Sequence, residues 1–74
     1  MKVYKNSDGT YESRNGSSRE IYSLIFDNEK GYSISTDREY EGHESGSDYE
    51  DLGHISKAKA NKCFSDFIKE KKDA

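Results

Sequence analysis

Residues 20–36 read EIYSLIFDNEKGYSIST and contain most of the apolar side chains in the N-terminal half of this 74-residue chain. On both sides of residues 28–31 a set of apolar residues falls at every second position, which is typical of strands with one buried face. Residues 28–31 end in a glycine and have the length of a four-residue hairpin loop. The stretch therefore predicts two antiparallel strands. One face is expected to carry Tyr22, Leu24, Phe26, Tyr32, Ile34 and Thr36.

Two turn signals precede this hairpin. Asp8-Gly9 and Asn15-Gly16 are dipeptides that favour two-residue type I′ turns, because both central residues of such a turn need a positive φ. A turn at Asp8-Gly9 would place Lys5 opposite Glu12 and Tyr4 near Tyr11. A turn at Asn15-Gly16 would place Glu12 near Arg19. The N-terminal 36 residues are therefore expected to form a β-meander.

A helix is predicted over residues 56–72. Ser56 is a good N-cap, and lysines near the end suit the negative pole of the helix. One apolar stripe at helical spacing contains Ala60, Cys63, Phe64, Phe67 and Ile68. Cys63 is interpreted as a packing residue, since free cysteines behave as small buried hydrophobic groups. The predicted fold is α+β: a single domain, residues 1–74, with a three- or four-stranded antiparallel β-meander packed against one C-terminal helix.

Residues 37–55 separate these two parts and lose the apolar periodicity. Within them, residues 37–51 carry a net charge of −6, whereas the preceding segment is neutral and the following one is +3. Glycine and serine recur, and no aliphatic residue occurs before Leu52. The segment is predicted to be a long acidic loop, or an extension of the fourth strand followed by a loop. Long loops in small domains are usually functional or disordered.

Three interpretations of the acidic segment differ in function. Counted from Asp37, the segment has acidic residues at positions 1, 3, 5 and 12 and Gly42 at position 6, which resembles the spacing of an EF-hand loop. However, position 12 is an aspartate where an EF-hand has a glutamate, and no helix precedes the loop. No metal site is therefore expected. The segment can be a solvated loop, or it can contact a basic partner through carboxylates and tyrosines. The residues of this predicted partner site are Asp37, Glu39, Tyr40, Glu41, Glu44, Asp48, Tyr49, Glu50 and Asp51.

Several classes of function are disfavoured by the sequence. No nucleophile elbow, phosphate-binding loop or His-Glu-x-x-His motif occurs, so the chain is predicted not to be an enzyme and to need no cofactor. A single cysteine excludes an internal disulfide, and no apolar run is long enough for a membrane span or a signal peptide. The expected location is the cytoplasm.

Two other surfaces remain open as alternatives. A lysine-rich helix face could bind nucleic acid, whereas the acidic segment would repel phosphates. This face comprises Lys57, Lys59, Lys62, Lys69, Lys71 and Lys72. Ile21 and Ile25 lie on the second face of the predicted sheet, and an uncovered apolar face would favour a homodimer.

Two family resemblances bear on function. Residues 19–42 (REIYSLIFDNEKGYSISTDREYEG) and residues 63–71 (CFSDFIKEK) resemble the strand–turn–strand and closing helix of WGR domains, which bind nucleic acid beside catalytic domains. Asp37-Arg38-Glu39 stands where that family has its Trp-Gly-Arg signature, so no functional residue is carried over. In size and charge, the whole chain resembles small acidic inhibitors from phages and mobile elements, including anti-CRISPR proteins. This second resemblance implies an acidic surface that occupies a nucleic-acid channel.

The predicted function is accordingly a non-catalytic protein-binding module, with an acidic surface that docks on a basic site of a nucleic-acid-handling protein. The alternatives are a degenerate nucleic-acid-binding module that uses the lysine face, and an accessory protein of unknown role.

Overall fold

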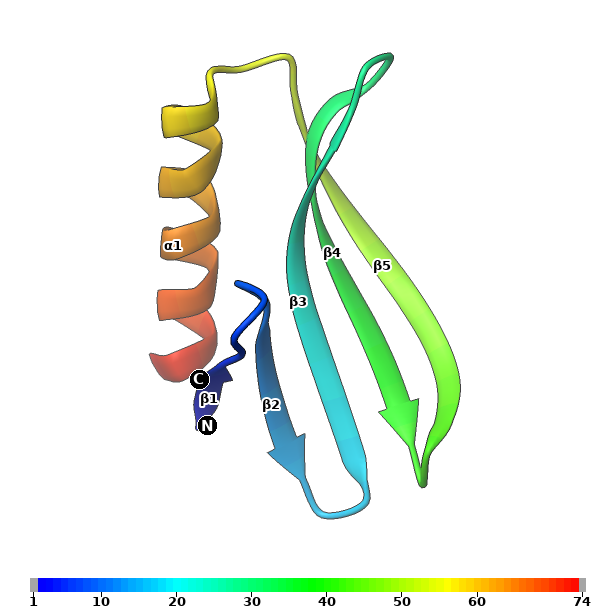
Figure 1. Cartoon of the computed structure of the whole chain (residues 1–74). Helices are drawn as coiled ribbons and strands as arrows, with labels where there is room; N and C mark the ends of the chain where they lie inside the picture. The colour runs from blue at the N-terminus through cyan, green and yellow to red at the C-terminus, as the bar shows by residue number, and fades with distance from the viewer. Residues whose placement is uncertain (1, 74) are drawn as a thin grey trace.

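The computed structural model describes residues 2–73 as a five-stranded antiparallel sheet with one helix packed on one of its faces (Figure 1). The strands are β1 (Val3–Lys5), β2 (Tyr11–Asn15), β3 (Ser18–Asp27), β4 (Gly31–Tyr40) and β5 (His43–Gly53), followed by helix α1 (Lys57–Asp73). Their order in the sheet is their order in the chain. The α+β class with a C-terminal helix is confirmed, but the predicted number of three or four strands is wrong.

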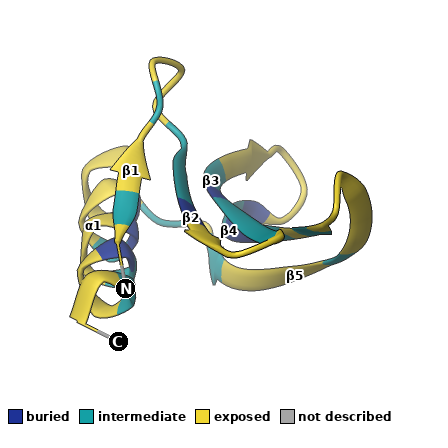
Figure 2. Ribbon diagram, turned by 90° about the horizontal axis from the view of Figure 1, so that it is seen from below, coloured by how far each residue is buried: buried dark blue, intermediate teal, exposed yellow. Residues whose placement is uncertain are grey.

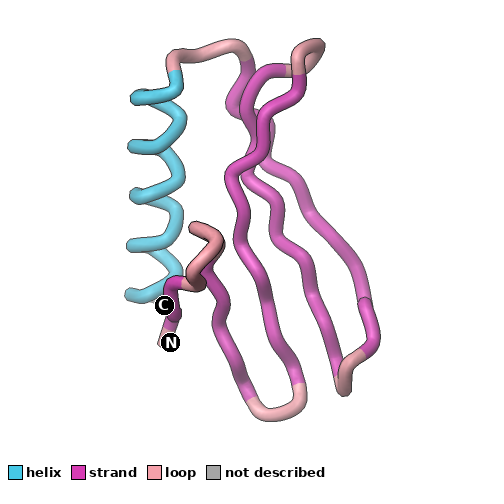
Figure 3. Tube along the Cα trace, viewed as in Figure 1, coloured by secondary structure: helices cyan, strands magenta, loops and turns pink. Residues whose placement is uncertain are grey.

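The fifth strand accounts for this difference. Residues 43–53, which the sequence predicted to be a loop, pair with β4 along almost its whole length (Figure 3). The sequence left two alternatives for residues 37–55, a long loop or an extension of the fourth strand followed by a loop. Strand β4 does extend to Tyr40, in agreement with the second alternative. The loop expected to follow that extension is instead a two-residue turn and an eleven-residue strand.

Strands β3 and β4 form the centre of the sheet in the predicted hairpin, with Tyr22 opposite Thr36 and Leu24 opposite Ile34. Helix α1 packs on the face that carries these residues (Figure 2), and the core consists of a few large side chains. The fully buried ones are Tyr22 and Ile34. Phe26, predicted on the same face, remains 58% exposed near the end of its strand.

Aromatic contacts join the helix to the sheet. The Phe64 ring meets Tyr11 edge-on at 5.7 Å between centroids, and Phe67 meets Tyr22 in the same way at 5.6 Å. Edge-to-face pairs of this kind add to the stabilisation from buried area. The predicted apolar stripe is thus in place, and Ser56 caps the helix by accepting a hydrogen bond from the Lys59 amide at 3.2 Å.

The two early connections differ from the two-residue turns predicted at Asp8-Gly9 and Asn15-Gly16. The loop between β1 and β2 spans residues 6–10, so Tyr4 pairs with Glu12 and Lys5 pairs with Tyr11. A shift of one residue reverses the faces, and Tyr4 therefore lies on the side away from Tyr11. The β2–β3 turn is Gly16-Ser17, with a positive φ of 62° at the first position, as in a type II′ turn. Glu12 and Arg19 are still near, at 3.9 Å across a diagonal.

At the other end of the sheet, the β3–β4 hairpin touches the chain where β5 ends. A Cβ on Gly31 would lie 2.2 Å from the carbonyl oxygen of Gly53. Next to this contact, the His54 side chain donates from Nε2 to the carbonyl oxygen of Glu29 at 2.8 Å. The connection from β5 to the helix is therefore fixed against the hairpin (Figure 1).

Replacement of Gly31 tests this contact, and Gly42 provides a matched control. Both glycines have nearly the same φ, 82° and 81°, but a Cβ on Gly42 would have no atom within 4 Å. Gly42→Ala should lower the free energy of unfolding by about 1–2 kcal/mol, the cost of the left-handed conformation. Gly31→Ala should cost about 1–3 kcal/mol more, because backbone atoms must also move. Equal losses in urea unfolding would contradict the contact.

Candidate partner-binding surface

The acidic residues singled out in the sequence lie on the hairpin formed by β4 and β5. Its two-residue turn has positive φ at both central residues, 51° for Glu41 and 81° for Gly42, which is typical of a type I′ turn. The amide of Glu41 donates to the carbonyl oxygen of Ser17 at 2.9 Å. The tips of the β4–β5 and β2–β3 hairpins are therefore tied to each other, and the acidic hairpin does not project alone.

Strand β5 contributes few apolar groups to the core, so polar pairs contribute to its placement. Arg38 on β4 donates from Nε to Glu20 on β3 at 3.1 Å, and its Nη1 lies 2.6 Å from Asp48 on β5. The carboxylates raise the pKa of Arg38, Asp48 chiefly through its hydrogen bond. On the opposite face, Ser47 donates to Asp37 at 2.7 Å. Both faces thus have a polar contact that joins β5 to its neighbour.

The predicted partner-site residues are not gathered on one surface. Because side chains alternate along a strand, the register of β4 and β5 divides them between two faces. The face that packs against the helix has Tyr40, Asp48 and Glu50. The opposite face has Asp37, Glu39, Tyr49 and Asp51. Glu41 and Glu44 are at the tip, in the turn and beside it. The residues that the sequence placed in one loop are therefore divided between the two faces of a hairpin, and their role in partner binding stays a prediction.

Ion pairs divide the acids further. Glu39 is bound by Arg19, whose Nε donates to it at 2.9 Å, and Asp48 is bound by Arg38. Within residues 2–73, the carboxylates of Glu41, Glu44, Glu50 and Asp51 have no such partner. No lysine, arginine or histidine nitrogen in this part of the chain lies within 4.0 Å of them. We call these four residues the free hairpin acids: Glu41, Glu44, Glu50 and Asp51. All four are exposed.

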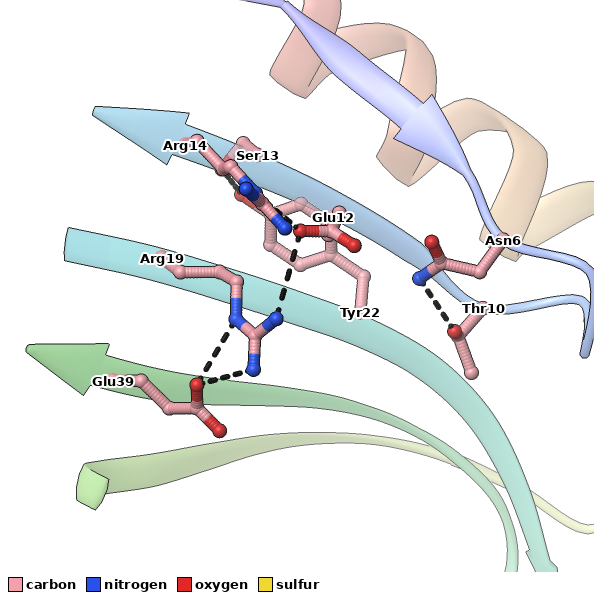
Figure 4. A network of polar contacts seen from close by, with 8 residues as sticks. All are labelled: Asn6, Thr10, Glu12, Ser13, Arg14, Arg19, Tyr22 and Glu39. Atoms are coloured by element: carbon pink, nitrogen blue, oxygen red, sulfur yellow. Dashed lines mark hydrogen bonds and ion pairs between the residues drawn. The ribbon is translucent and has the colours of Figure 1, made fainter. Parts of the chain in front are cut away.

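A second polar network lies on the face away from the helix, as Figure 4 shows. Glu12 on β2 accepts a hydrogen bond from Arg14 at 2.9 Å and lies near Arg19, which in turn binds Glu39. The hydrogen bond from Arg14 lowers the pKa of Glu12, and the positive charges of both arginines act in the same direction. The two arginines on this face are therefore engaged by acids of the protein itself.

The hydroxyl of Tyr22 connects the core to the polar residues. It donates to Glu20 at 2.8 Å. It also lies 3.0 Å from the hydroxyl of Ser13 (Figure 4). Burial raises the pKa of Tyr22, and the adjacent carboxylate acts in the same direction. With Arg38 and Asp48, these groups form a continuous polar chain across β2, β3, β4 and β5. Sequence periodicity did not indicate this chain, because only the link from Tyr22 to Glu20 lies within one strand, whereas the links to Ser13, Arg38 and Asp48 join different strands.

Several grooves lie around the sheet in residues 2–73. One of about 380 Å³ extends over polar residues of the sheet, among them Glu20, Arg38 and Tyr40. Another, of about 460 Å³, lies near the start of α1 and has Phe26 and Tyr32 in its wall, with ring centroids 4.9 Å apart. A third, of about 320 Å³, separates β5 from α1. It is lined by Glu50, Leu52, Cys63, Asp66, Phe67 and Glu70.

The lysine-rich helix face is less basic than its sequence indicated. Lys62 lies 3.7 Å from Asp66 one turn later, and exposed Glu70 and Asp73 follow on the same helix. Lys71 is half-buried, with its Nζ 5.2 Å from the Phe67 ring centroid and 5.7 Å from that of Tyr22. Lys71 thus covers the edge of the core, as long cationic side chains often do.

Comparisons with protein-family models, curated proteins and solved structures found no match to this chain. Within residues 2–73, no group of three His, Cys, Asp or Glu side chains is placed to hold a metal ion. Helix α1 is not long and apolar enough to cross a membrane.

Acid unfolding tests the network around Glu12. In the folded protein this carboxyl stays ionised to a lower pH than in the unfolded chain, where its ordinary pKa is 4.5. Its stabilising contribution is therefore present above about pH 4.5 and is lost as the pH falls through the lower pKa of the folded state. Melting temperatures measured from neutral to acidic pH should fall across this window, and the Glu12→Gln variant should show a lower starting value and a shallower fall. An unchanged slope in the variant would contradict the assignment.

Proposed function

We propose that this protein is a non-catalytic protein-binding module that docks the acidic β4–β5 hairpin on a basic surface of a partner protein. The observation that carries the proposal is the presence of uncompensated carboxylates on an exposed, ordered strand. Glu50 and Asp51 lie on opposite faces of β5, so negative charge is presented on both sides of the same edge.

The pairing of the arginines supports this proposal. Arg38 lies on the hairpin and Arg19 on the neighbouring strand β3, and Asp48 and Glu39 respectively engage them. The negative charge that remains is therefore available to a second molecule. Complementary charge of this kind accelerates association and discriminates against partners of the wrong sign.

The order of the hairpin also supports docking. A loop of this length would lose conformational freedom when it bound, and that loss would weaken the complex. A strand paired to β4 has already lost this freedom during folding. Tyr49, at 63% exposure, and Tyr40, at 56%, add contact area at low entropic cost.

The partner proposed is a nucleic-acid-handling protein, whose basic channel would be occupied by the hairpin. This part rests on the resemblance in size and charge to small acidic inhibitors of phage and mobile-element origin. In such a complex, carboxylates would take the place of phosphates. The mixed charges of α1 give less support to the alternative in which the protein itself binds nucleic acid.

Association kinetics test the proposal. Chemical crosslinking in the source cells followed by purification would supply the partner, and wild type would be compared with the Glu50→Gln/Asp51→Asn variant. At low ionic strength the variant should associate about threefold more slowly or worse, because electrostatic steering is weakened. Its rate should also depend less on salt between about 0.01 and 0.15 M, where the Debye length falls from about 30 to about 8 Å.

A matched control removes two charges elsewhere. Glu29→Gln/Asp73→Asn neutralises one acid in the β3–β4 loop and one at the end of α1, and should leave the association rate close to that of wild type. If the two variants associate equally fast, the hairpin is not the docking surface. If instead wild type binds a random DNA duplex and neutralisation of Lys59, Lys69 and Lys72 abolishes that binding, the nucleic-acid alternative is correct.

A further inference from the structure

Strand β5 is an edge of the sheet, and its outer side has no neighbouring strand among residues 2–73. Its register against β4 shifts near both ends, around Ser45 and around Leu52. Between these irregularities, residues 46–51 pair regularly with β4. The backbone N–H and C=O groups that point away from β4 in this segment form a row that another strand can pair with.

The side chains of this edge select the strand that can be added. Asp48 and Glu50 alternate on the helix side of β5, and Asp51 lies on the other side beside Tyr49. A second copy of the chain paired through the same edge would bring carboxylates next to carboxylates, which is destabilising. A strand with basic residues at alternate positions would meet the opposite charge instead.

The groove between β5 and α1 fits such a basic side chain. Its apolar wall contains Leu52 and Phe67, and its rim carries the carboxylates of Glu50 and Glu70. The methylene stem of an arginine or lysine can pack on the apolar wall while its cationic head reaches the carboxylates. The groove adjoins the strand edge, because Glu50 and Leu52 belong to both.

We infer that the partner contributes an extended basic segment that adds to β5 as a sixth strand and places one cationic side chain in the groove between β5 and α1. This inference rests on the proposed function and deepens it, since it specifies how the acidic hairpin engages its partner. Backbone hydrogen bonds would hold the segment, and the alternating charges would fix which of its faces turns toward the helix.

A model peptide tests the inference directly. The probe is the capped peptide acetyl-Thr-Arg-Thr-Arg-Thr-Arg-Thr-amide, titrated into the full-length ¹⁵N-labelled protein while amide spectra are recorded. Two further peptides carry one backbone N-methyl group each, on the central arginine or on the threonine after it. Because successive N–H groups of a strand point to opposite sides, only one of the two methyl groups would block pairing with β5.

If the peptide adds to β5 as a strand, one methylated peptide should have an affinity at least about tenfold lower than that of the parent peptide. The affinity of the other should stay within about twofold of the parent. A tenfold change in affinity corresponds to about 1.4 kcal/mol. The spectral changes should centre on residues 46–51. Equal affinities of the two methylated peptides, or no saturable binding of the parent peptide, would overturn strand addition without touching the proposed function.

The acid variants separate the two proposals. Glu50→Gln/Asp51→Asn should weaken binding of the parent peptide severalfold, whereas Glu29→Gln/Asp73→Asn should leave it near wild type. If both variants bind the parent peptide as wild type does, acidic docking itself is wrong, and the inference fails together with the function on which it rests. The amide spectrum of each free variant verifies that it is folded.

Discussion

The guanidinium of Arg38 joins three strands of the sheet, because it contacts Glu20 on β3 and Asp48 on β5 from its own position on β4. Arg38 is the only lysine or arginine in residues 37–51, and the same segment contains seven aspartate and glutamate residues. Without Arg38, the carboxylates of Glu20 on β3 and Asp48 on β5 would lose the cation that they share. The ordered acidic edge, and the surface proposed for partner binding, depend on this neutralisation together with the backbone ladder between β4 and β5.

The core that supports this edge is small. Its buried part consists of Tyr22, Ile34, Phe64 and Ile68. A domain of this size is only marginally stable, so strong repulsion between charges would unfold it. The hydroxyl of Tyr22 links this core to Glu20 and hence to Arg38. The structure therefore engages part of its acidic charge internally, while Glu50 and Asp51 remain exposed on β5.

The sequence predicted the elements whose apolar periodicity is strong. The β3–β4 hairpin and the C-terminal helix follow from alternation around Tyr22 and from the stripe through Phe64. Strand β5 could not be predicted in this way, because HESGSDYEDLG has no apolar alternation and its order comes from pairing with β4. Its turn was also missed, since Glu41-Gly42 adopts a type I′ geometry without the usual Asn or Asp. For the pairing of β4 with β5, the position of Arg38 among the acids was a local signal of a cross-strand ion pair.

The same limits apply to the candidate site. The composition identified the acidic residues. Their division between the two faces of the sheet depends on the register of β5 against β4, and a count of charges gives no information about that register. The groove between β5 and α1 joins residues about twenty positions apart in the chain, such as Glu50 and Glu70, and only the tertiary structure brings them together.

Amide hydrogen exchange in the free protein tests the central claim, that residues 43–53 form an ordered edge strand. Amides of residues 46–51 that point toward β4 should exchange slowly, and those that point outward should exchange rapidly, so that protection alternates along the chain. Uniformly rapid exchange throughout residues 43–53, at the rate of an unstructured chain, would contradict the account and restore the acidic loop that the sequence indicated.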